Sequence, residues 1–353
     1  MTFEEARARF PVLERYAYLQ AGSVGPLSRA TVAAMREEEE RNLVEGRAGR
    51  EYIERILALR AELRAALAEL VGAEPEQVTL TTSTTDGCNI VLAGLDLGPE
   101  DELVTTTDEH FGLLGPLHTS GARVVVVPPD ADAIVAAVTP RTKLLAVSHV
   151  LWTTGQLLPV HDLRERIGLP LLVDGAQSVG AVPVDARGLD YYTISGQKWL
   201  CGPESTGALV VADPERLRVA RPSYFSQREH DPDGAFVPWP GARRFDPGWV
   251  PSSLMSGLLA AVSLRPEWGF ERASATAERC RELLRAAGAD VVVPAARGTL
   301  VSWRADADES AAAVERLAQA GVIVRDLPGR GLVRASVGWW TSDEDVDRLV
   351  AAL

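Results

Sequence analysis

The chain has 353 residues, of which 46% are hydrophobic and 24% are charged. This length is typical of about two domains, and the composition is that of a globular protein with a large apolar core. The formal net charge is −13, which argues against a nucleic-acid partner because phosphate backbones need clustered positive charge.

Neither a membrane nor a metal partner is expected. No apolar run approaches the roughly 20 residues that cross a bilayer, and the first residues lack the basic and apolar blocks of a signal peptide. We therefore expect a cytoplasmic protein. The three cysteines, Cys88, Cys201 and Cys280, have neither metal-ligand spacing nor the pattern of a disulfide framework.

The first half of the chain predicts helices followed by a sheet. Helices are predicted over 28–46 and 51–71, because apolar residues recur at helical spacing in the second and Gly72 follows as a stop. Short β-rich runs come next, several of them continuously apolar, as in strands covered on both faces. Helical or loop segments separate most of them, which predicts an α/β fold with a mainly parallel sheet. The runs are 78–82, 103–106, 124–127, 144–147, 171–173, 191–194 and 208–211.

The second half predicts a smaller α+β domain. Six prolines interrupt residues 221–252, which we expect to form a long loop and domain connection without regular structure. Helices then follow near 254–264, 272–287, 308–320 and 342–352, and strands over 291–293, 299–304, 322–325 and 332–336. We predict a large domain over 16–245 and a small domain over 246–353, with residues 1–15 packed on the small one.

Two charged residues at predicted strand ends indicate cofactor chemistry. The chain contains only two lysines, Lys143 and Lys198, and the second follows the run 191–194 just before a Gly/Pro turn. An amine placed there can attack an aldehyde, although a surface lysine at a strand end is the alternative. Asp174 follows the run 171–173 and can hold a pyridinium nitrogen. Because pyridoxal phosphate (PLP) requires both groups, we predict PLP as the cofactor and both residues as catalytic.

Further polar residues follow other predicted strands, where the ligands of open α/β sheets lie. Thr84 and Thr85 open the helix after the run 78–82, and such a turn can bind phosphate or be an ordinary N-cap. His110 follows the run 103–106, where its ring can stack on a cofactor and move protons. An ordinary loop histidine is the alternative.

Residues near Asp174 and Lys198 complete the predicted cofactor site. Gln177 can donate a hydrogen bond to the phenolate oxygen of the ring. Ser195 and Gln197 flank Lys198, and their hydroxyl and amide groups can reach phosphate oxygens.

Three residues are predicted to bind an amino-acid substrate. His149 follows the run 144–147 and can face substrate, or it can be a satisfied strand-end histidine. Arg325 and Arg334 lie nine residues apart at strand ends in the small domain. A guanidinium group grips a carboxylate with two hydrogen bonds, so either arginine can hold the α-carboxylate; a surface ion pair is the alternative.

Several motifs together resemble one enzyme family. The chain resembles the class V aminotransferases of the fold-type I PLP enzymes, which include cysteine desulfurases, isopenicillin N epimerase and cyst(e)ine C–S lyases. The resemblance implies a mainly parallel seven-stranded sheet in the large domain, a smaller α+β domain, an amino-acid substrate and a homodimer. The motifs occupy residues 84–89, 109–110, 148–156, 173–178 and 196–203.

Within this family the chain is most similar to the C–S lyases. His149 stands where desulfurases usually have asparagine, residues 198–203 match the lyase pattern, and the short run 325–334 contains no cysteine. In desulfurases an extended loop there carries the nucleophilic cysteine. The chain departs from its relatives at Gln197, where histidine is common, and at Trp249, where a threonine often reaches the phosphate of the neighbouring subunit.

These features predict β-elimination from a cysteine-type substrate. An aminotransferase, an epimerase or a desulfurase with an atypical thiol such as Cys201 is the alternative, although a small buried thiol is the simpler interpretation of that residue. A non-catalytic PLP-binding protein is a further alternative, which the retained Lys198 and Asp174 disfavour.

Overall fold

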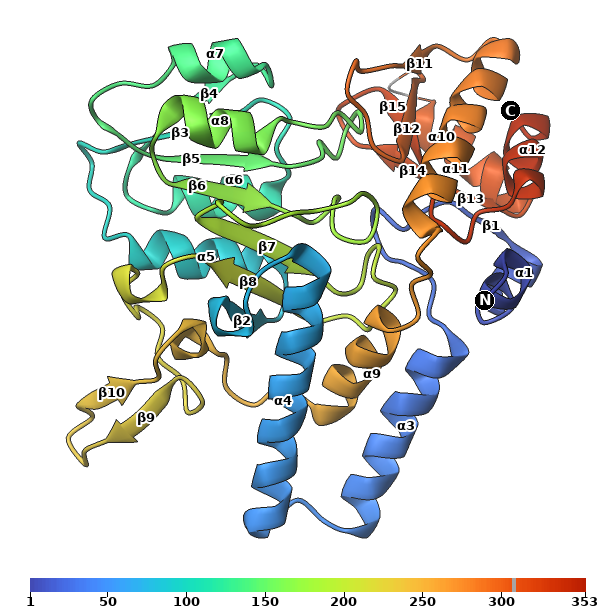
Figure 1. The fold of residues 1–353 in the computed structure, drawn as a ribbon. Helices are drawn as coiled ribbons and strands as arrows, with labels where there is room; N and C mark the ends of the chain where they lie inside the picture. The colour runs from blue at the N-terminus through green and yellow to red at the C-terminus, as the bar shows by residue number, and fades with distance from the viewer. Residues whose placement is uncertain (307–308) are drawn as a thin grey trace.

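A seven-stranded sheet forms the centre of the larger part of the molecule (Figure 1). The computed structural model describes residues 1–306 and 309–353. The strand order is β2-β8-β7-β6-β5-β3-β4; β8 is antiparallel to both neighbours, and all other adjacent pairs are parallel. The predicted mainly parallel sheet is therefore confirmed. Its strands are β2 (Val78–Thr81), β3 (Glu102–Thr106), β4 (Arg123–Val127), β5 (Thr142–Ser148), β6 (Leu171–Asp174), β7 (Tyr191–Ser195) and β8 (Gly207–Val211).

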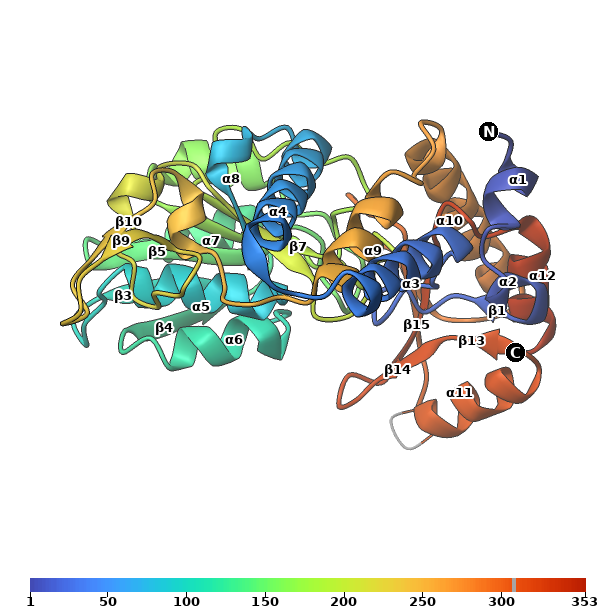
Figure 2. The same cartoon turned by 90° about the horizontal axis from the view of Figure 1, so that it is seen from below.

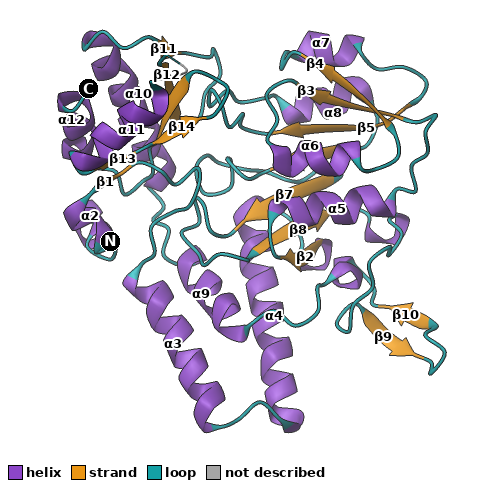
Figure 3. Ribbon diagram, turned by 180° about the vertical axis from the view of Figure 1, so that it is seen from behind, coloured by secondary structure: helices purple, strands orange, loops and turns teal. Residues whose placement is uncertain are grey.

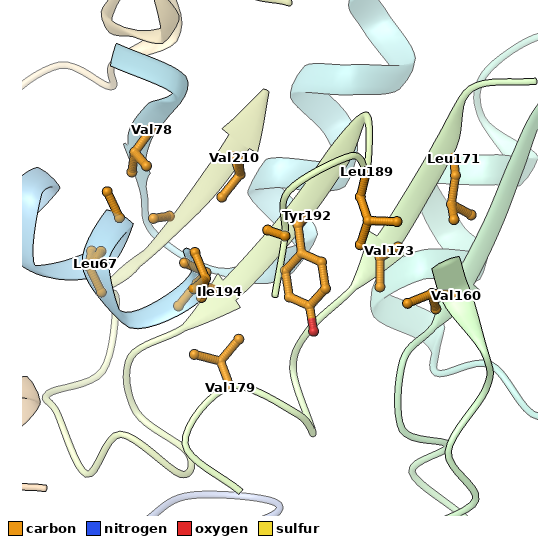
Figure 4. Packing of buried hydrophobic residues seen from close by; sticks show 14 of the residues in the cluster. Leu67, Val78, Val160, Leu171, Val173, Val179, Leu189, Tyr192, Ile194 and Val210 are labelled. Atoms are coloured by element: carbon orange, nitrogen blue, oxygen red, sulfur yellow. The ribbon is translucent and has the colours of Figure 1, made fainter. Parts of the chain in front are cut away.

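Helices cover both faces of this sheet, as Figures 1 and 3 show from opposite sides. One hydrophobic core joins the sheet to α4 (Gly49–Val71), α7 (Ala131–Ala136) and α8 (Val160–Ile167); part of it appears in Figure 4. A second core joins the other face to α5 (Thr84–Gly94) and α6 (Phe111–His118). Every residue of β2, β3, β6, β7 and β8 is buried, as expected of strands that are covered on both faces.

Three helices extend below the sheet (Figures 1 and 2). The structure places α3 at Arg29–Val44, and α4 ends at Gly72, which has the left-handed φ of 70° expected of a helix stop. The helix α9 (Ser252–Val262) packs against both. The domain boundary at 245/246 stays a prediction, and α9 lies beyond it in sequence although it contacts helices of the larger part.

The smaller part contains a four-stranded antiparallel sheet of order β11-β12-β15-β14. Its strands are β11 (Val291–Val292), β12 (Leu300–Arg304), β14 (Arg325–Leu327) and β15 (Leu332–Ser336), with the helices α10 (Gly269–Ala286), α11 (Ser310–Gln319) and α12 (Asp343–Ala351). The predicted helix near 308–320 starts at a residue that lies outside the described part of the chain.

The prediction of one strand over 322–325 is wrong. The structure has two short strands there, and only β14 belongs to the four-stranded sheet. The other, β13 (Val322–Ile323), pairs in parallel with β1 (Ala17–Tyr18). The reason is that β13 has a partner about 300 residues away in the chain, which local residue patterns do not reveal.

The N-terminal helices α1 (Phe3–Arg7) and α2 (Val12–Arg15) lie on the smaller part. Arg7 pairs with Asp345 at 2.6 Å, and the ring of Phe10 meets that of Trp339 at 5.5 Å. Trp339 and Trp340 are both buried in the hydrophobic cluster that includes Phe10. Among the helices of the described residues, none is long and apolar enough to span a bilayer.

Residues 221–252 are not free of regular structure, so that expectation is wrong. A hairpin of β9 (Gln227–His230) and β10 (Phe236–Pro238) projects from the sheet, followed by the 3-10 turn η3 (Ala242–Phe245) (Figure 1). Shorter 3-10 turns occur at η1 (Pro75–Gln77) and η2 (Pro214–Arg216). Proline is tolerated in the hairpin because Pro238 ends a strand of a two-stranded ribbon, at a break in its register.

Candidate active site

Lys198 lies at the carboxyl end of the large sheet, just after β7, next to the strand that ends at Asp174. Its amine has no hydrogen-bond or ion-pair partner among the residues that the structure describes. Burial lowers the pKa of Lys198 to about 8, Asp174 acts against this shift, and Arg334 and Arg325 add to it. The amine is therefore neutral at a lower pH than that of an exposed lysine, as a nucleophile requires.

The N-terminal loop over residues 20–25 covers Lys198. Gly25 N donates to Gln197 O at 2.7 Å, and a Cβ on Gly25 would lie 2.1 Å from Lys198 O. A Cβ on Gly22 would lie 2.8 Å from Nη2 of Arg334. Only glycine permits both approaches. The sequence analysis missed this loop, and its two closely spaced glycines are the signal that could have indicated it.

Asp174 presents one satisfied and one free carboxylate oxygen. Its side chain is 3% exposed, and Oδ1 accepts hydrogen bonds from Ala176 N at 2.9 Å and from Thr193 Oγ1 at 3.3 Å. No donor reaches Oδ2 within residues 1–306 and 309–353. The carboxylate is thus held in place while one oxygen is left for a ligand N–H.

The first turn of α5 has the features of an anion site. Thr84 and Thr85 are its first two residues, and the N-cap is Ser83, whose Oγ accepts from Asp86 N at 3.1 Å. The turn therefore does have an ordinary serine N-cap, with Ser83 as the capping residue and Thr84 and Thr85 as the first helical residues. The opening N–H groups of a helix have no partner inside the helix and point outward together with the positive end of its dipole.

Ser195 and Gln197 lie beside this turn. Ser195 is the last residue of β7, and its Oγ donates to Gln197 Oε1 at 3.4 Å. Its partner in the β7–β8 register is Gly207, where a Cβ would come within 3.5 Å of the Ser83 backbone. The sheet register thus places Ser195 two strands away from β2, the strand that leads into α5, and Gln197 is bound to Ser195.

His110 is the N-cap of α6, and its Nδ1 accepts from Gly112 N at 3.0 Å. This contact leaves the proton of the neutral imidazole on Nε2. Partial burial of the imidazole lowers the pKa of His110, and the charge of Lys198 lowers it further. The ring meets that of Trp152 edge-on, with 5.2 Å between centroids. A neutral, fixed ring is compatible with stacking on a flat cofactor.

Arg334 is buried with unused hydrogen-bond donors. It is 1% exposed, and Nη1 donates to Trp152 O at 2.6 Å. Its Nε and Nη2 have no partner in the described chain, so the alternative of a surface ion pair does not hold for this residue. Burial lowers the pKa of Arg334 to about 9, and the charge of Arg325 contributes. Orphaned donors on a buried guanidinium fit a carboxylate ligand.

Two predicted site residues have other contacts. Gln177 Nε2 donates to Gly22 O at 2.8 Å, and its Oε1 accepts from Trp199 Nε1 at 3.0 Å, so the amide mainly ties protein segments together. His149 does not join the Lys198 cluster: its Nδ1 lies 2.7 Å from the hydroxyl of Tyr192, a residue of the core in Figure 4. These contacts match the alternative of a satisfied strand-end histidine.

Comparisons with known proteins find relatives that match most of the chain. Isopenicillin N epimerase of Streptomyces clavuligerus is 29% identical over 391 residues, covering 99% of this chain and 97% of the relative. A cysteine desulfurase of Haloferax volcanii is 30% identical over 331 residues, covering 81% and 76%. A solved structure of the cystine C–S lyase C-DES with its product cysteine persulfide is 27% identical, with a TM-score of 0.90 and coverage of 97% and 98%. In another C-DES structure, a mutant, glycine is covalently linked to the PLP cofactor.

The fold and the cluster define a fold-type I enzyme that uses PLP. The family model described as aminotransferase class-V matches residues 17–349, and the chain belongs to this family. The residues present fit the cofactor, because α5 offers its N-terminus, and because within the described residues the Lys198 amine and one oxygen of Asp174 have no partner.

Proposed function

We propose that the enzyme is a lyase that cleaves the C–S bond of cysteine, cystine or an S-substituted cysteine by β-elimination. The observation that carries this proposal is the state of its thiols. All three cysteines are buried and free, and burial raises the pKa of Cys201, the thiol nearest Lys198 in sequence, well above its ordinary value. A sulfur relay needs an accessible thiolate, whereas β-elimination needs none.

Bound PLP supplies an electron sink that stabilises negative charge at the substrate Cα. Arg334 then holds the α-carboxylate through Nε and Nη2, which fixes the direction of the Cα–H bond. Lys198, neutral above a pH of about 8, accepts the Cα proton at Nζ. Asp174 would hold the ring nitrogen of bound PLP through Oδ2, and its charge would keep that nitrogen protonated. Loss of the β-sulfur substituent gives pyruvate, ammonia and a thiol or persulfide after hydrolysis.

An epimerase is the second candidate. The near full-length similarity to isopenicillin N epimerase favours it, because epimerisation also begins with removal of the Cα proton. An epimerase returns that proton to the other face and breaks no C–S bond. Transamination and sulfur relay remain further alternatives, and each leaves a different product.

We also propose that the enzyme is a homodimer in the cytoplasm. A row of aromatic rings supports the dimer: Tyr52, Trp249 and Tyr224 are stacked with centroids 6.2 and 6.4 Å apart. Trp249 is 56% exposed and Tyr224 is 64% exposed, and such a patch is typical of an interface. Light scattering on the purified protein tests the dimer, and a mass near 37.9 kDa would contradict it.

One experiment separates the candidate reactions. The PLP-loaded enzyme is incubated with cysteine, cystine and S-substituted cysteines without an added keto acid, and pyruvate, alanine, sulfide and the D-amino acid are assayed together. Pyruvate equal to the substrate consumed supports the lyase. Stoichiometric alanine indicates a desulfurase, and an inverted amino acid indicates an epimerase. Activity should also persist in Cys201→Ser, since the proposed chemistry uses no thiol.

A further inference from the structure

Glu109 is a buried acid that the proposed chemistry does not use. It is 2% exposed, in the turn between β3 and α6, directly before His110. Its Oε1 accepts from Thr106 Oγ1 at 2.8 Å, and both carboxylate oxygens accept from Ser148 N, at 3.0 and 3.1 Å. Ser148 Oγ also donates to Oε2. These bonds tie the turn that carries His110 to the end of β5.

The same contacts bring Glu109 toward Asp174. Ser148 and Asp174 are direct partners in the β5–β6 ladder, and Glu109 binds the Ser148 backbone N–H, so β5 lies between the Glu109 carboxyl and the strand that carries Asp174. The charge of Asp174 also raises the pKa of Glu109. Burial raises the pKa of Cys88 on α5, and the charges of Asp174 and Glu109 contribute to that rise. The two acids therefore share one buried environment.

A matched acid with a different environment lies on β3, the strand that precedes the turn of Glu109. Glu102, at the amino end of β3, is also 2% exposed, but it accepts hydrogen bonds from Arg141 and Arg123. No cation lies within ion-pair distance of Glu109 in the part of the chain that the structure covers. A buried acid without a counterion is costly, and such groups are concentrated at functional sites.

We propose that Glu109 is a positioning residue that holds the turn of His110 and places a second negative charge one strand away from Asp174, so that its protonation tunes that of the cofactor ring nitrogen. This inference rests on the PLP cofactor and on the proposed role of Asp174, but not on which reaction follows. A negative charge near Asp174 favours the protonated ring nitrogen, and a neutral Glu109 weakens that effect.

The titration of Glu109 is separable from that of the Cys88 thiol. Burial raises its pKa to about 7, so the carboxyl is neutral below that pH and charged above it. The groups that face it are Asp174 on β6, the Cys88 thiol on α5, Ser148 on β5 and the neighbouring His110. Burial holds the pKa of Cys88 well above its ordinary value, so this thiol does not titrate in the same range.

The test measures the ring nitrogen in holoenzyme loaded with ¹⁵N-labelled PLP, by its NMR shift between pH 5.5 and 9.5. The parent should show a transition with a midpoint near 7, which Glu109→Gln should abolish and Glu102→Gln should retain. The proposal would be overturned if the parent and Glu109→Gln showed the same transition. It would also be overturned if the parent showed no transition in this pH range.

A second variant keeps the proposal testable if Glu109→Gln does not fold. Ser148→Ala removes one donor to the carboxylate and should move the midpoint to higher pH, because the charged form loses a hydrogen bond. An unmoved midpoint would also overturn it. Because the readout is the cofactor and not turnover, failure of this proposal is distinct from failure of the lyase proposal.

Discussion

Arg325 and Arg334 face each other directly across the β14–β15 pair, with no acidic side chain bound to either within the described residues. Like charges opposite each other in a ladder are destabilising. Arg325 reaches Ser23 Oγ at 2.9 Å, whereas Arg334 keeps two unused donors. The arrangement is explained if an anionic ligand completes it, and this ligand is the substrate carboxylate in our proposal.

Arg334→Lys should raise KM for the amino-acid substrate about 10- to 100-fold. Lysine keeps the charge but loses the planar pair of donors, and hydrogen bonds to charged groups contribute about 1.5–3 kcal/mol. The visible spectrum of the resting holoenzyme should be unchanged. Steady-state kinetics measures KM, and absorbance measures the spectrum. If Arg334→Lys has the same KM as the parent enzyme, the substrate carboxylate is assigned to Arg325 instead.

Lys198→Ala should abolish the covalent link to the cofactor and nearly all turnover. Lys143 is the matched control, since it lies near the amino end of β5, is 53% exposed and pairs with Asp101 at 3.8 Å. Lys143→Ala should retain both properties. Borohydride reduction followed by peptide mapping identifies the linked residue, and a label on Lys143 would contradict the site.

Cofactor uptake by the apoprotein should speed up with rising pH and level off above about 8. Only the neutral amine attacks the aldehyde, and the pKa of Lys198 is lowered to about 8 from its ordinary 10.5. Stopped-flow absorbance gives the rate at each pH. A rate that still rises steeply near pH 10 would show that burial does not lower this pKa.

Asp174→Asn should retain cofactor binding while exchange of the substrate α-proton slows severely. Asparagine has nearly the same size, but it removes the charge that keeps the ring nitrogen protonated. Deuterium exchange at Cα, followed by NMR, reports this step without depending on which product forms. Exchange at the parental rate would remove Asp174 from this role.

Because of His149, the folded protein should be less stable in mild acid than at neutral pH. Burial lowers its pKa to about 4 from 6.5, so between these values the unfolded chain binds a proton that the folded chain refuses. Stability is therefore fully present above pH 6.5 and falls toward pH 4, by at most about 3 kcal/mol.

His149→Gln, which can still accept from Tyr192, should flatten this fall in urea unfolding at pH 7 and pH 5. His118→Gln serves as the control because His118 is solvent-exposed. Equal pH slopes in His149→Gln and the parent would contradict the prediction.

The sequence by itself determined the layer architecture and the two central residues of the site, Asp174 and Lys198. Strands buried on both faces leave continuous apolar runs, so β6 and β7 could be located, and Asp174 and Lys198 follow directly from their ends. The N-terminus of α5 was predictable for the same reason, because a strand, a polar turn and a helix are local features.

Only the tertiary structure decided what surrounds that pair. Three features join segments that lie far apart in the chain. They are the orphaned donors of Arg334, the loop at Gly22 that covers Lys198, and the pairing of β1 with β13. The turn of His149 toward Tyr192 and the burial of Glu109 against Ser148 depend on which face of the sheet each side chain meets. Residue type and spacing locate a strand end, but burial and hydrogen-bond partners, which set charge and protonation, arise only when distant segments pack together.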